Sequence, residues 1–365
     1  MTVHTEKRDA GRGTATAGVA PPELRAQGQL PRWATAGVLV GAAVVVGVLL
    51  SVTGMFGVAL LVVATVVVFA VALYALSRAV EGVRKATDRL VTIVVTTAFL
   101  IAMIPLISVV VTVIGNGLAR MDAEFFTSSM RGVIGEGGGI YHAIMGTLLI
   151  TGLAALMSIP IGLLTAVYLV EYGKANRLAR AITFFVDVMT GIPSIVAGLF
   201  AYALFVLFLG PGARLGLAAA VGLAVLMIPI VVRSTEEMLK IVPNELREAA
   251  FALGVPKWRT ILKVVIPTSI AGITSGITLA IARVIGETAP LLVTVGIATG
   301  VNMNPFEGRM ATLPVFAYTQ YQSPGVAREA AFDRLWAAAL VLIIIVMALN
   351  LVARVIARLF APKTR

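Results

Sequence analysis

Residues 248–254 read EAAFALG, and residues 264–267 read VVIP after a gap of nine residues. Both stretches lie between long apolar segments, so the sequence places a short helix with small side chains between two segments that can cross a membrane. A short polar helix in this position is suited to contact with a soluble protein. The surrounding sequence therefore indicates that this chain is one part of a larger assembly.

The helix around this stretch has its own start and stop signals. Pro243 and Asn244 can begin it, Glu245 suits its positive N-terminal end, and Gly254 can end it in the left-handed conformation, which predicts a helix over 244–254. Small side chains would let a partner approach closely, and apolar ones would anchor it. The residues expected to meet the partner are Leu246, Glu248, Ala249, Ala250, Phe251 and Gly254. An amphipathic helix on the lipid surface is the alternative interpretation.

The composition sets the class of the protein. Hydrophobic residues make up 59% of the 365 residues, charged residues 13%, and the mean hydropathy is +0.98, so the chain cannot cover a soluble globule with polar side chains. It contains no cysteine, which excludes disulfides, thiolate metal sites and cysteine catalysis, and only two histidines, His4 and His142. We therefore predict an all-α polytopic membrane protein that is not an enzyme, with no catalytic or metal site and no bound cofactor.

About 20 apolar residues suffice to cross the hydrocarbon of a bilayer, and the chain offers enough such segments for about eight transmembrane helices. The predicted spans are 34–52, 56–76, 90–114, 143–170, 181–209, 215–239, 267–297 and 335–357. The first is longer than the core of a signal peptide, so we expect it to be retained.

The basic residues predict the orientation. Most of the 29 Lys and Arg residues fall in segments that would share one side of the membrane, and such segments stay cytoplasmic. We therefore expect a cytoplasmic basic tail over 1–32, a cytoplasmic loop over 77–89, a cytoplasmic tail over 358–365 and an extracytoplasmic loop over 115–140. This topology explains the net charge of +11 without any nucleic-acid partner.

The EAAFALG and VVIP stretches together resemble the EAA loop of the permease subunits of bacterial ABC importers. That loop usually ends in I-x-L-P, so Val and Ile here replace Ile and Leu conservatively. The resemblance implies a type I (MetI-like) permease core, here over 141–357, whose loop helix couples to an ATP-hydrolysing subunit. The chain has no G-x-x-x-x-G-K-[ST] phosphate loop of its own, so ATP and Mg²⁺ would be used by the partner.

Two charged residues lie in the seventh predicted span. Gly286 and Pro290 interrupt this long apolar segment, which indicates a broken helix. Arg283 and Glu287 are one turn apart, and ionisable residues at such depth usually line a bundle interior or an aqueous path. They could instead form a buried pair that holds helices together, or Glu287 could weaken the hold of Arg283 on an anion.

Residues 283–292 read RVIGETAPLL and resemble the R-x-x-G-E-T-A-P-L-L motif of the PstA family of phosphate-importer permeases. Further matches to that family lie at 138–148, 191–195 and 313–315. The candidate residues of the substrate path are Arg283, Glu287, Thr288, Ser194 and Asp187, and the resemblance implies that the substrate is phosphate. Two alternatives within the class are the sister PstC-type permease, which typically lacks Ala-Pro-Leu-Leu after Glu-Thr, and a permease for molybdate, sulfate or phosphonate.

The fifth predicted span contains a second interruption. Gly191 and Pro193 should produce a local kink, because Pro cannot donate its backbone hydrogen bond. Ser194 could then face an anion path, although the kink could equally serve helix packing. Asp187 could pair with Arg283 or Arg233, or face a cytoplasmic cavity.

The resemblance also implies the remaining partners. These are a homologous PstC-type permease, a PstB-type ATPase dimer and a PstS-type extracytoplasmic phosphate-binding protein, which segments 115–140 and 298–333 are long enough to contact. The location implied is the bacterial cytoplasmic membrane, with 33–114 forming three N-terminal helices before the core. A secondary transporter or channel, and a membrane-embedded sensory or scaffolding subunit, are the competing classes.

Overall fold

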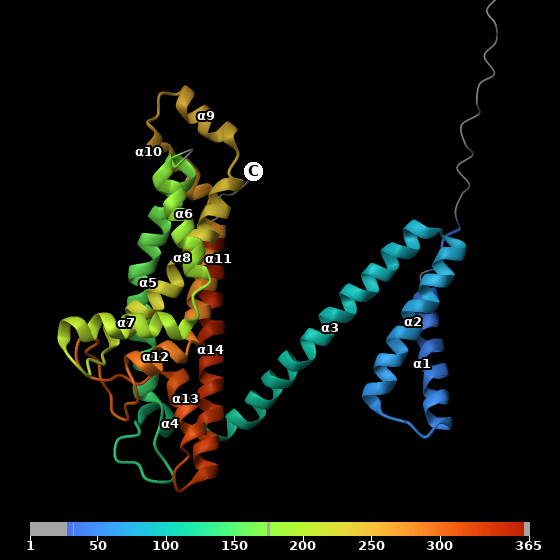
Figure 1. Ribbon diagram of the computed structural model, residues 1–365, viewed down its shortest axis with the longest axis horizontal. Helices are drawn as coiled ribbons and strands as arrows, with labels where there is room; N and C mark the ends of the chain where they lie inside the picture. Colours follow the sequence, from blue (N-terminus) through green and yellow to red (C-terminus); the bar gives the residue numbers. More distant parts are fainter. Residues whose placement is uncertain (1–27, 32, 174–175, 361–365) are drawn as a thin grey trace, which may run out of the picture. The chain divides into compact units, whose positions relative to one another are not determined.

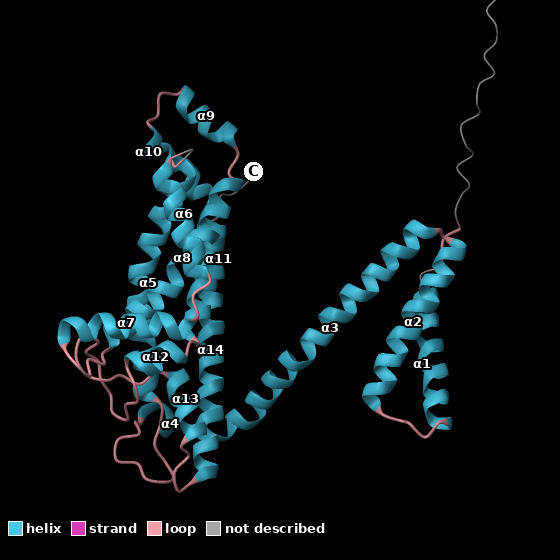
Figure 2. Ribbon diagram, in the orientation of Figure 1, coloured by secondary structure: helices cyan, strands magenta, loops and turns pink. Residues whose placement is uncertain are grey.

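The computed structural model describes residues 28–31, 33–173 and 176–360, and every regular element in these ranges is a helix (Figure 2). The all-α class predicted from the sequence is confirmed. Most of the expected basic tail over 1–32, including His4, lies outside the described residues, as do residues 361–365. The chain divides after Ile107 into two compact units.

The N-terminal unit is built on a helical hairpin. Helix α1 (Ala34–Val52) packs against α2 (Val58–Val80), and α3 (Val83–Gly117) begins after a break of two residues (Figure 1). Apolar side chains such as Val44 and Val71 are more than half exposed on these helices. A helix that is apolar on nearly all sides is suited to a lipid environment.

The segment 77–89, expected to be a loop, is helical except at Glu81 and Gly82. Gly82 has a φ of 91°, which lets the chain turn between the two helices. Hydropathy shows where a segment leaves the hydrocarbon of the membrane, and this is why a loop was expected. Backbone hydrogen bonds can continue a helix beyond that point, so the segment is helical although it is polar. The basic residues Arg84, Lys85 and Arg89 consequently lie on the first two turns of α3.

Glu81 is the centre of a polar cluster at this junction. Its side chain is only 3% exposed and accepts hydrogen bonds from the backbone N–H of Leu30 at 2.9 Å and the hydroxyl of Ser77 at 2.8 Å. Arg89 forms an ion pair with it at 2.8 Å. The Leu30 N–H first, with Arg89 and Ser77, lowers the pKa of Glu81 from 4.5 to about 2. Glu81 thus ties residues 28–31 to both helices.

Replacing Glu81 by Gln should release Leu30 from the α2–α3 junction. Because the native pKa is depressed, the stabilising contribution of Glu81 is full above its ordinary pKa and is lost as the pH falls from about 4.5 towards 2. We expect amide exchange at Leu30 to become about tenfold faster at neutral pH, and to become less sensitive to acid than in the parent. Asp88→Asn, an exposed position outside the cluster, is the control, and equal exchange in both variants would contradict this assignment.

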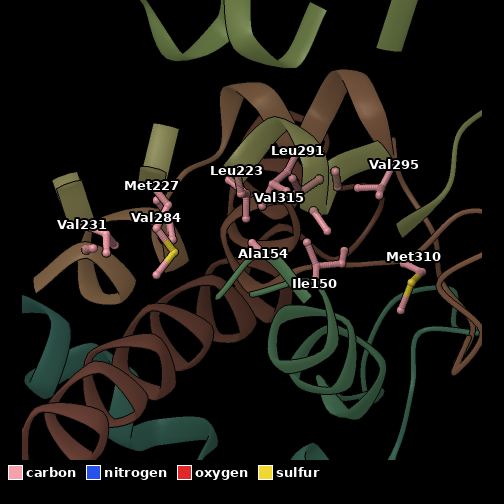
Figure 3. Close-up of a cluster of buried hydrophobic side chains, with 13 residues drawn as sticks. Ile150, Ala154, Leu223, Met227, Val231, Val284, Leu291, Val295, Met310 and Val315 are labelled. Carbon is pink, nitrogen blue, oxygen red and sulfur yellow. The ribbon is translucent and has the colours of Figure 1, made fainter. Parts of the chain in front are cut away.

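The C-terminal unit is organised around α5 (Tyr141–Val167), α8 (Gly216–Ile241) and α11 (Ile266–Ile285), with α14 (Arg328–Phe360) packed on α11. Apolar side chains of α5, α8 and α11, with Leu291, Val295, Met310 and Val315 from the segments after α11, form the buried cluster of Figure 3. Glycine permits the closest contacts: a Cβ at Gly276 would lie 2.4 Å from the hydroxyl oxygen of Ser234. Small residues at helix contacts are the usual device by which membrane helices approach closely.

Two elements of this unit are broken. Helices α6 (Arg177–Thr190) and α7 (Ser194–Leu209) are bent by 109° at a short break, so the interruption expected in the fifth span is a break between two helices and not a local kink. Helix α11 ends at Ile285, and the short α12 (Ala289–Thr294) follows it. Within the described residues, seven helices are long and apolar enough to cross a membrane, or eight if α6 and α7 count as one span.

Short elements close the two ends of the C-terminal unit (Figure 1). One end, here called the α9 end, carries two α-helices and two π-helical segments: α9 (Asn244–Ala252), α10 (Lys257–Thr260), η2 (Tyr168–Tyr172) and η3 (Ile261–Val265). The opposite end carries η1 (Leu118–Arg120), α4 (Ala123–Thr127) and α13 (Leu313–Gln322).

Candidate functional site

A pocket of about 230 Å³ lies where the two broken elements meet α8. It receives residues from the α6–α7 break, from the middle of α8 and from the end of α11. The residues that line it are Met189, Thr190, Ile192, Pro193, Ser194, Leu226, Pro229, Ile230, Arg283 and Glu287. The pocket therefore brings together Arg283, Glu287 and Ser194, which come from two motifs far apart in the sequence.

Arg283 is the positive group of this pocket. It lies in the last turn of α11, is exposed in this chain, and has no carboxylate of the described residues within ion-pair distance. A guanidinium presents planar, permanently charged donors that match the oxygens of an oxyanion. The end of α11 thus supplies a cation that no carboxylate of the described chain neutralises by direct pairing.

Glu287 lines the same pocket without pairing with Arg283. The helix ends at Ile285 with Gly286 as its cap, so Glu287 lies beyond the helix rather than one helical turn from Arg283. Its backbone N–H donates to the carbonyl of Val284 at 3.2 Å. The interpretation of these two residues as a buried ion pair therefore does not hold within the described chain. Thr288 is half-buried at the start of α12 and is outside the pocket lining.

Ser194 places the N-terminal end of a 16-residue helix at the pocket. It is the first residue of α7, and Pro193 before it makes no side-chain cap. The first N–H groups of a helix are unsatisfied within the helix, and its dipole is positive there. Ser194 adds a hydroxyl, so this wall offers both donors and positive potential.

The α7 wall is held in place by a close backbone contact with α12. A Cβ at Gly198 would lie 2.5 Å from the Cα of Pro290, so only glycine allows this approach. The helix-breaking residues expected from the sequence lie at the two breaks. Gly191 and Pro193 are between α6 and α7, and Gly286 and Pro290 flank the break after α11. The two breaks converge because α7 packs on α12.

Asp187 lies on α6, one turn before the pocket, and it pairs with Arg233 on α8 rather than with Arg283. Arg233 also contacts Glu236 at 2.8 Å, and Glu236 contacts Lys240 at 2.6 Å. The structure thus selects one of the three environments considered for Asp187. This charge chain leads from beside the pocket towards the α9 end.

Helix α9 presents a distinct outer face. Glu245, Glu248, Ala249 and Ala252 are exposed and share one helical stripe. Ala250, by contrast, is only 8% exposed because it packs towards this chain. The expectation that Ala250 belongs to the docking face is therefore wrong.

The two apolar residues expected at the docking site, Leu246 and Phe251, flank that stripe. Leu246 is 41% exposed, Phe251 44%, and Leu253, which follows the helix, 83%. Gly254 has a φ of 74°, the left-handed conformation expected of a helix-ending glycine, although the helix itself ends at Ala252. The exposed surface of α9 is therefore a mixture of carboxylates, small residues and apolar side chains.

Sequence reasoning missed the inner attachment of α9. Arg247 forms an ion pair with Glu171 at 2.9 Å, and both side chains are largely buried. The available signals were an arginine directly before the EAA stretch and an acidic residue at the end of an apolar segment. It also missed the α8 wall of the pocket, where Pro229 inside a predicted span was the signal.

Comparisons with known proteins agree with this architecture. The family described as "Binding-protein-dependent transport system inner membrane component" matches residues 158–365. The chain is also similar to one chain of the MetNI methionine ABC transporter in inward-facing conformations. That likeness has a TM-score of 0.50 and 20% identity, and covers 66% of this chain and 100% of the other. At this identity, the likeness supports the fold alone.

Similarity to curated proteins is higher. "Phosphate transport system permease protein PstA 1" of Mycobacterium tuberculosis H37Rv is 50% identical over 272 residues, which cover 74% of this chain and 86% of that protein. The PstA proteins of Mycobacterium leprae and Yersinia pestis are 47% and 37% identical, over 73% and 77% of this chain and 88% and 92% of their own lengths. This chain therefore belongs to the PstA permeases within the binding-protein-dependent transport system inner-membrane component family.

Proposed function

We propose that this chain is the membrane permease subunit through which an ATP-driven importer moves inorganic phosphate into the cell. The observation that carries the proposal is the pocket that joins Arg283, Ser194 and the N-terminal end of α7. Charge-assisted donors on a guanidinium, a hydroxyl and free backbone N–H groups are complementary to a tetrahedral oxyanion. The names of the similar proteins supply phosphate as the particular anion.

The assembly we propose contains four kinds of protein. This chain pairs with a homologous PstC-type permease, its α9 docks into a PstB-type ATPase dimer that uses ATP and Mg²⁺, and a PstS-type protein delivers phosphate. The α9 end then faces the cytoplasm, and the α13 end faces the outside, where segments 115–140 and 298–333 meet the binding protein. Both termini are cytoplasmic in this arrangement, in the bacterial plasma membrane.

The pocket suggests how phosphate is held without being trapped. Arg283 attracts the anion, while Glu287 in the same lining repels it, so the net hold is weaker than that of the arginine alone. High-affinity selection then belongs to the delivery protein. Closure of the ATPase dimer displaces α9 and switches the helix bundle between two packed arrangements.

Uptake by a reconstituted complex tests the proposal. The chain, its permease partner, the ATPase and the binding protein are placed in vesicles, and labelled phosphate entry is measured with and without ATP. ATP-dependent entry that resists sulfate and molybdate is the expected result. Entry without ATP would favour a secondary transporter or channel, and ATPase binding without any uptake would favour a scaffolding role.

The docking role of α9 gives a separate prediction. Ala249→Arg adds a bulky charge to the outer stripe of α9 without disturbing the inner face. We expect ATPase binding to weaken by about tenfold or more, because a close backbone approach is blocked, while the thermal stability of the permease is retained. The measurement is binding of the purified ATPase to permease in nanodiscs. Glu237→Gln, an exposed change on α8 beside the α9 end, is the control, and unaltered binding by Ala249→Arg would refute docking through this stripe.

A further inference from the structure

Helix α9 is attached to its own chain chiefly through one side chain. Ala250 is the buried residue of α9, so little apolar surface holds this helix in place. Arg247, whose side chain is 13% exposed, instead donates to the carbonyl oxygens of Val242 at 2.6 Å and Leu239 at 3.0 Å. These bonds tie α9 to the end of α8.

The same guanidinium reaches a second element. Its Nε and Nη2 donate to one carboxylate oxygen of Glu171, at 3.0 and 2.9 Å, and Glu171 is 7% exposed. Lys257 on α10 donates to the backbone carbonyl of Glu171 and lies over the Tyr172 ring, with 4.7 Å from Nζ to the ring centroid. Glu171 is therefore the point at which α9 and α10 meet the continuation of α5.

Glu171 lies in a π-helical segment. Segment η2 (Tyr168–Tyr172) follows α5 directly, and η3 (Ile261–Val265) leads from α10 into α11, which ends beside Arg283. Single π-helical turns in proteins occur frequently at functional sites, because they interrupt regular helical hydrogen bonding. The contact of α9 with the continuation of α5, and the chain that leads from α10 to α11, thus both involve π-helical turns, whereas α8 joins α9 directly through Val242 and Pro243.

There is also open space beside this attachment. A cavity of about 410 Å³ is bordered by Glu171 and Arg247 together with Lys240, Asn244, Phe251 and Lys257. An element held by polar bonds next to a cavity can move without first breaking a packed apolar contact. The polar bonds of Arg247, to Glu171 and to the end of α8, are therefore a main part of what orients α9.

We infer that Glu171 and Arg247 are positioning residues for energy coupling: their buried ion pair transmits displacement of α9 to α5 through η2, in parallel with the covalent route through η3 to α11. The inference rests on the proposed function. Neither residue contacts the transported anion in this assignment. A buried charge pair is suited to this role because separating its members leaves two uncompensated charges, so the two elements move together.

The test is the number of phosphate ions imported per ATP hydrolysed by the full complex. Glu171→Gln keeps the shape of the side chain and removes its charge, and we expect the ratio to fall about tenfold while ATP hydrolysis continues. Glu171→Asp, which retains the charge, should recover part of the ratio. Glu237→Gln, at an exposed carboxylate beside the same end, should leave it unchanged.

A direct measurement separates positioning from simple destabilisation. Because the chain has no cysteine, two introduced cysteines can carry spin labels: one at Pro243, the exposed residue that begins α9 and lies outside the docking stripe, and one at Leu156 on the exposed side of α5. The ATP-dependent change in their distance should be present in the parent and lost in Glu171→Gln, with unchanged complex assembly.

Each outcome has a defined meaning. A parent complex that imports no phosphate would refute the proposed function. A coupled parent with an unchanged import ratio and distance change in Glu171→Gln would refute the positioning role alone. Loss of assembly in Glu171→Gln would also refute it, because the pair would then be required for folding or docking rather than for coupling.

Discussion

Replacing Arg283 by alanine is expected to reduce ATP-dependent phosphate uptake at least tenfold while the complex still assembles. Arg283 lines the pocket, is exposed in this chain, and has no carboxylate of the described residues within ion-pair distance, so its loss removes positive charge without leaving a buried carboxylate unpaired. Hydrogen bonds to charged groups contribute about 1.5–3 kcal/mol, which corresponds to roughly tenfold or more in rate if they form at the rate-limiting step. The measurement is labelled phosphate uptake into vesicles that contain the full complex.

The lysine variant distinguishes charge from geometry. Arg283→Lys keeps the positive charge but loses the planar fork that binds two oxygens at once, so we expect uptake between the parent and alanine values. Arg354→Ala, at an exposed position on α14 away from the pocket, removes one arginine without this effect. Parent-level uptake by Arg283→Ala in an assembled complex would remove Arg283 from the anion path.

Replacing Gly146 by valine should prevent the C-terminal unit from packing correctly. A Cβ at Gly146 would lie 1.9 Å from the carbonyl oxygen of Ala311, and this oxygen belongs to backbone that cannot rotate away. The next residue, Thr147, accepts a hydrogen bond from the N–H of Leu313 at 2.8 Å, so α5 and this segment are fixed together. Overpacking costs about 1–3 kcal/mol or more, and a clash with backbone belongs at the upper end.

Thermal unfolding of the purified permease in nanodiscs measures this effect. We expect a lower Tm and a lower yield for Gly146→Val. Gly152→Val is the matched control, because Gly152 lies on the same helix with nothing within 4 Å of its added Cβ. Both variants carry the same β-branched residue, so their helix propensities are equal and only the contact with Ala311 differs. Equal Tm values for the two variants would show that the segment around Ala311 moves aside.

The helix boundaries show how far sequence reasoning reaches. The sequence predicts the first span at 34–52, and the helix is Ala34–Val52. The two agree because the length of an uninterrupted apolar segment can be counted directly in the sequence. The break at Gly286 was also expected from the sequence, since a glycine and a nearby proline act on the local backbone. The sequence predicts the position of the α6–α7 break but not its bend angle of 109°. The bend brings α7 against α12, where Gly198 packs on Pro290, and such a contact between distant residues is not visible in the sequence.

The ion-pair partners of the charged side chains could not be predicted from the sequence. Spacing placed Arg283 and Glu287 on one helical face, but the helix ends between them and they share a pocket without an ion pair. Asp187 had three candidate environments, and the approach of α6 to α8 chose Arg233. Such partners lie far apart in the sequence, where neither periodicity nor composition specifies a distance.

The sequence by itself determined the membrane class, the approximate spans, the helix-breaking positions and the residues of the two family motifs, because hydropathy, proline and glycine act locally. Only the tertiary structure decided that the two breaks enclose one pocket with a wall from α8, that Ala250 faces inwards, and that Arg247 joins α9 to Glu171. These features arise from close packing between helices, which brings distant residues within a few ångströms and has no counterpart in the local pattern of the chain.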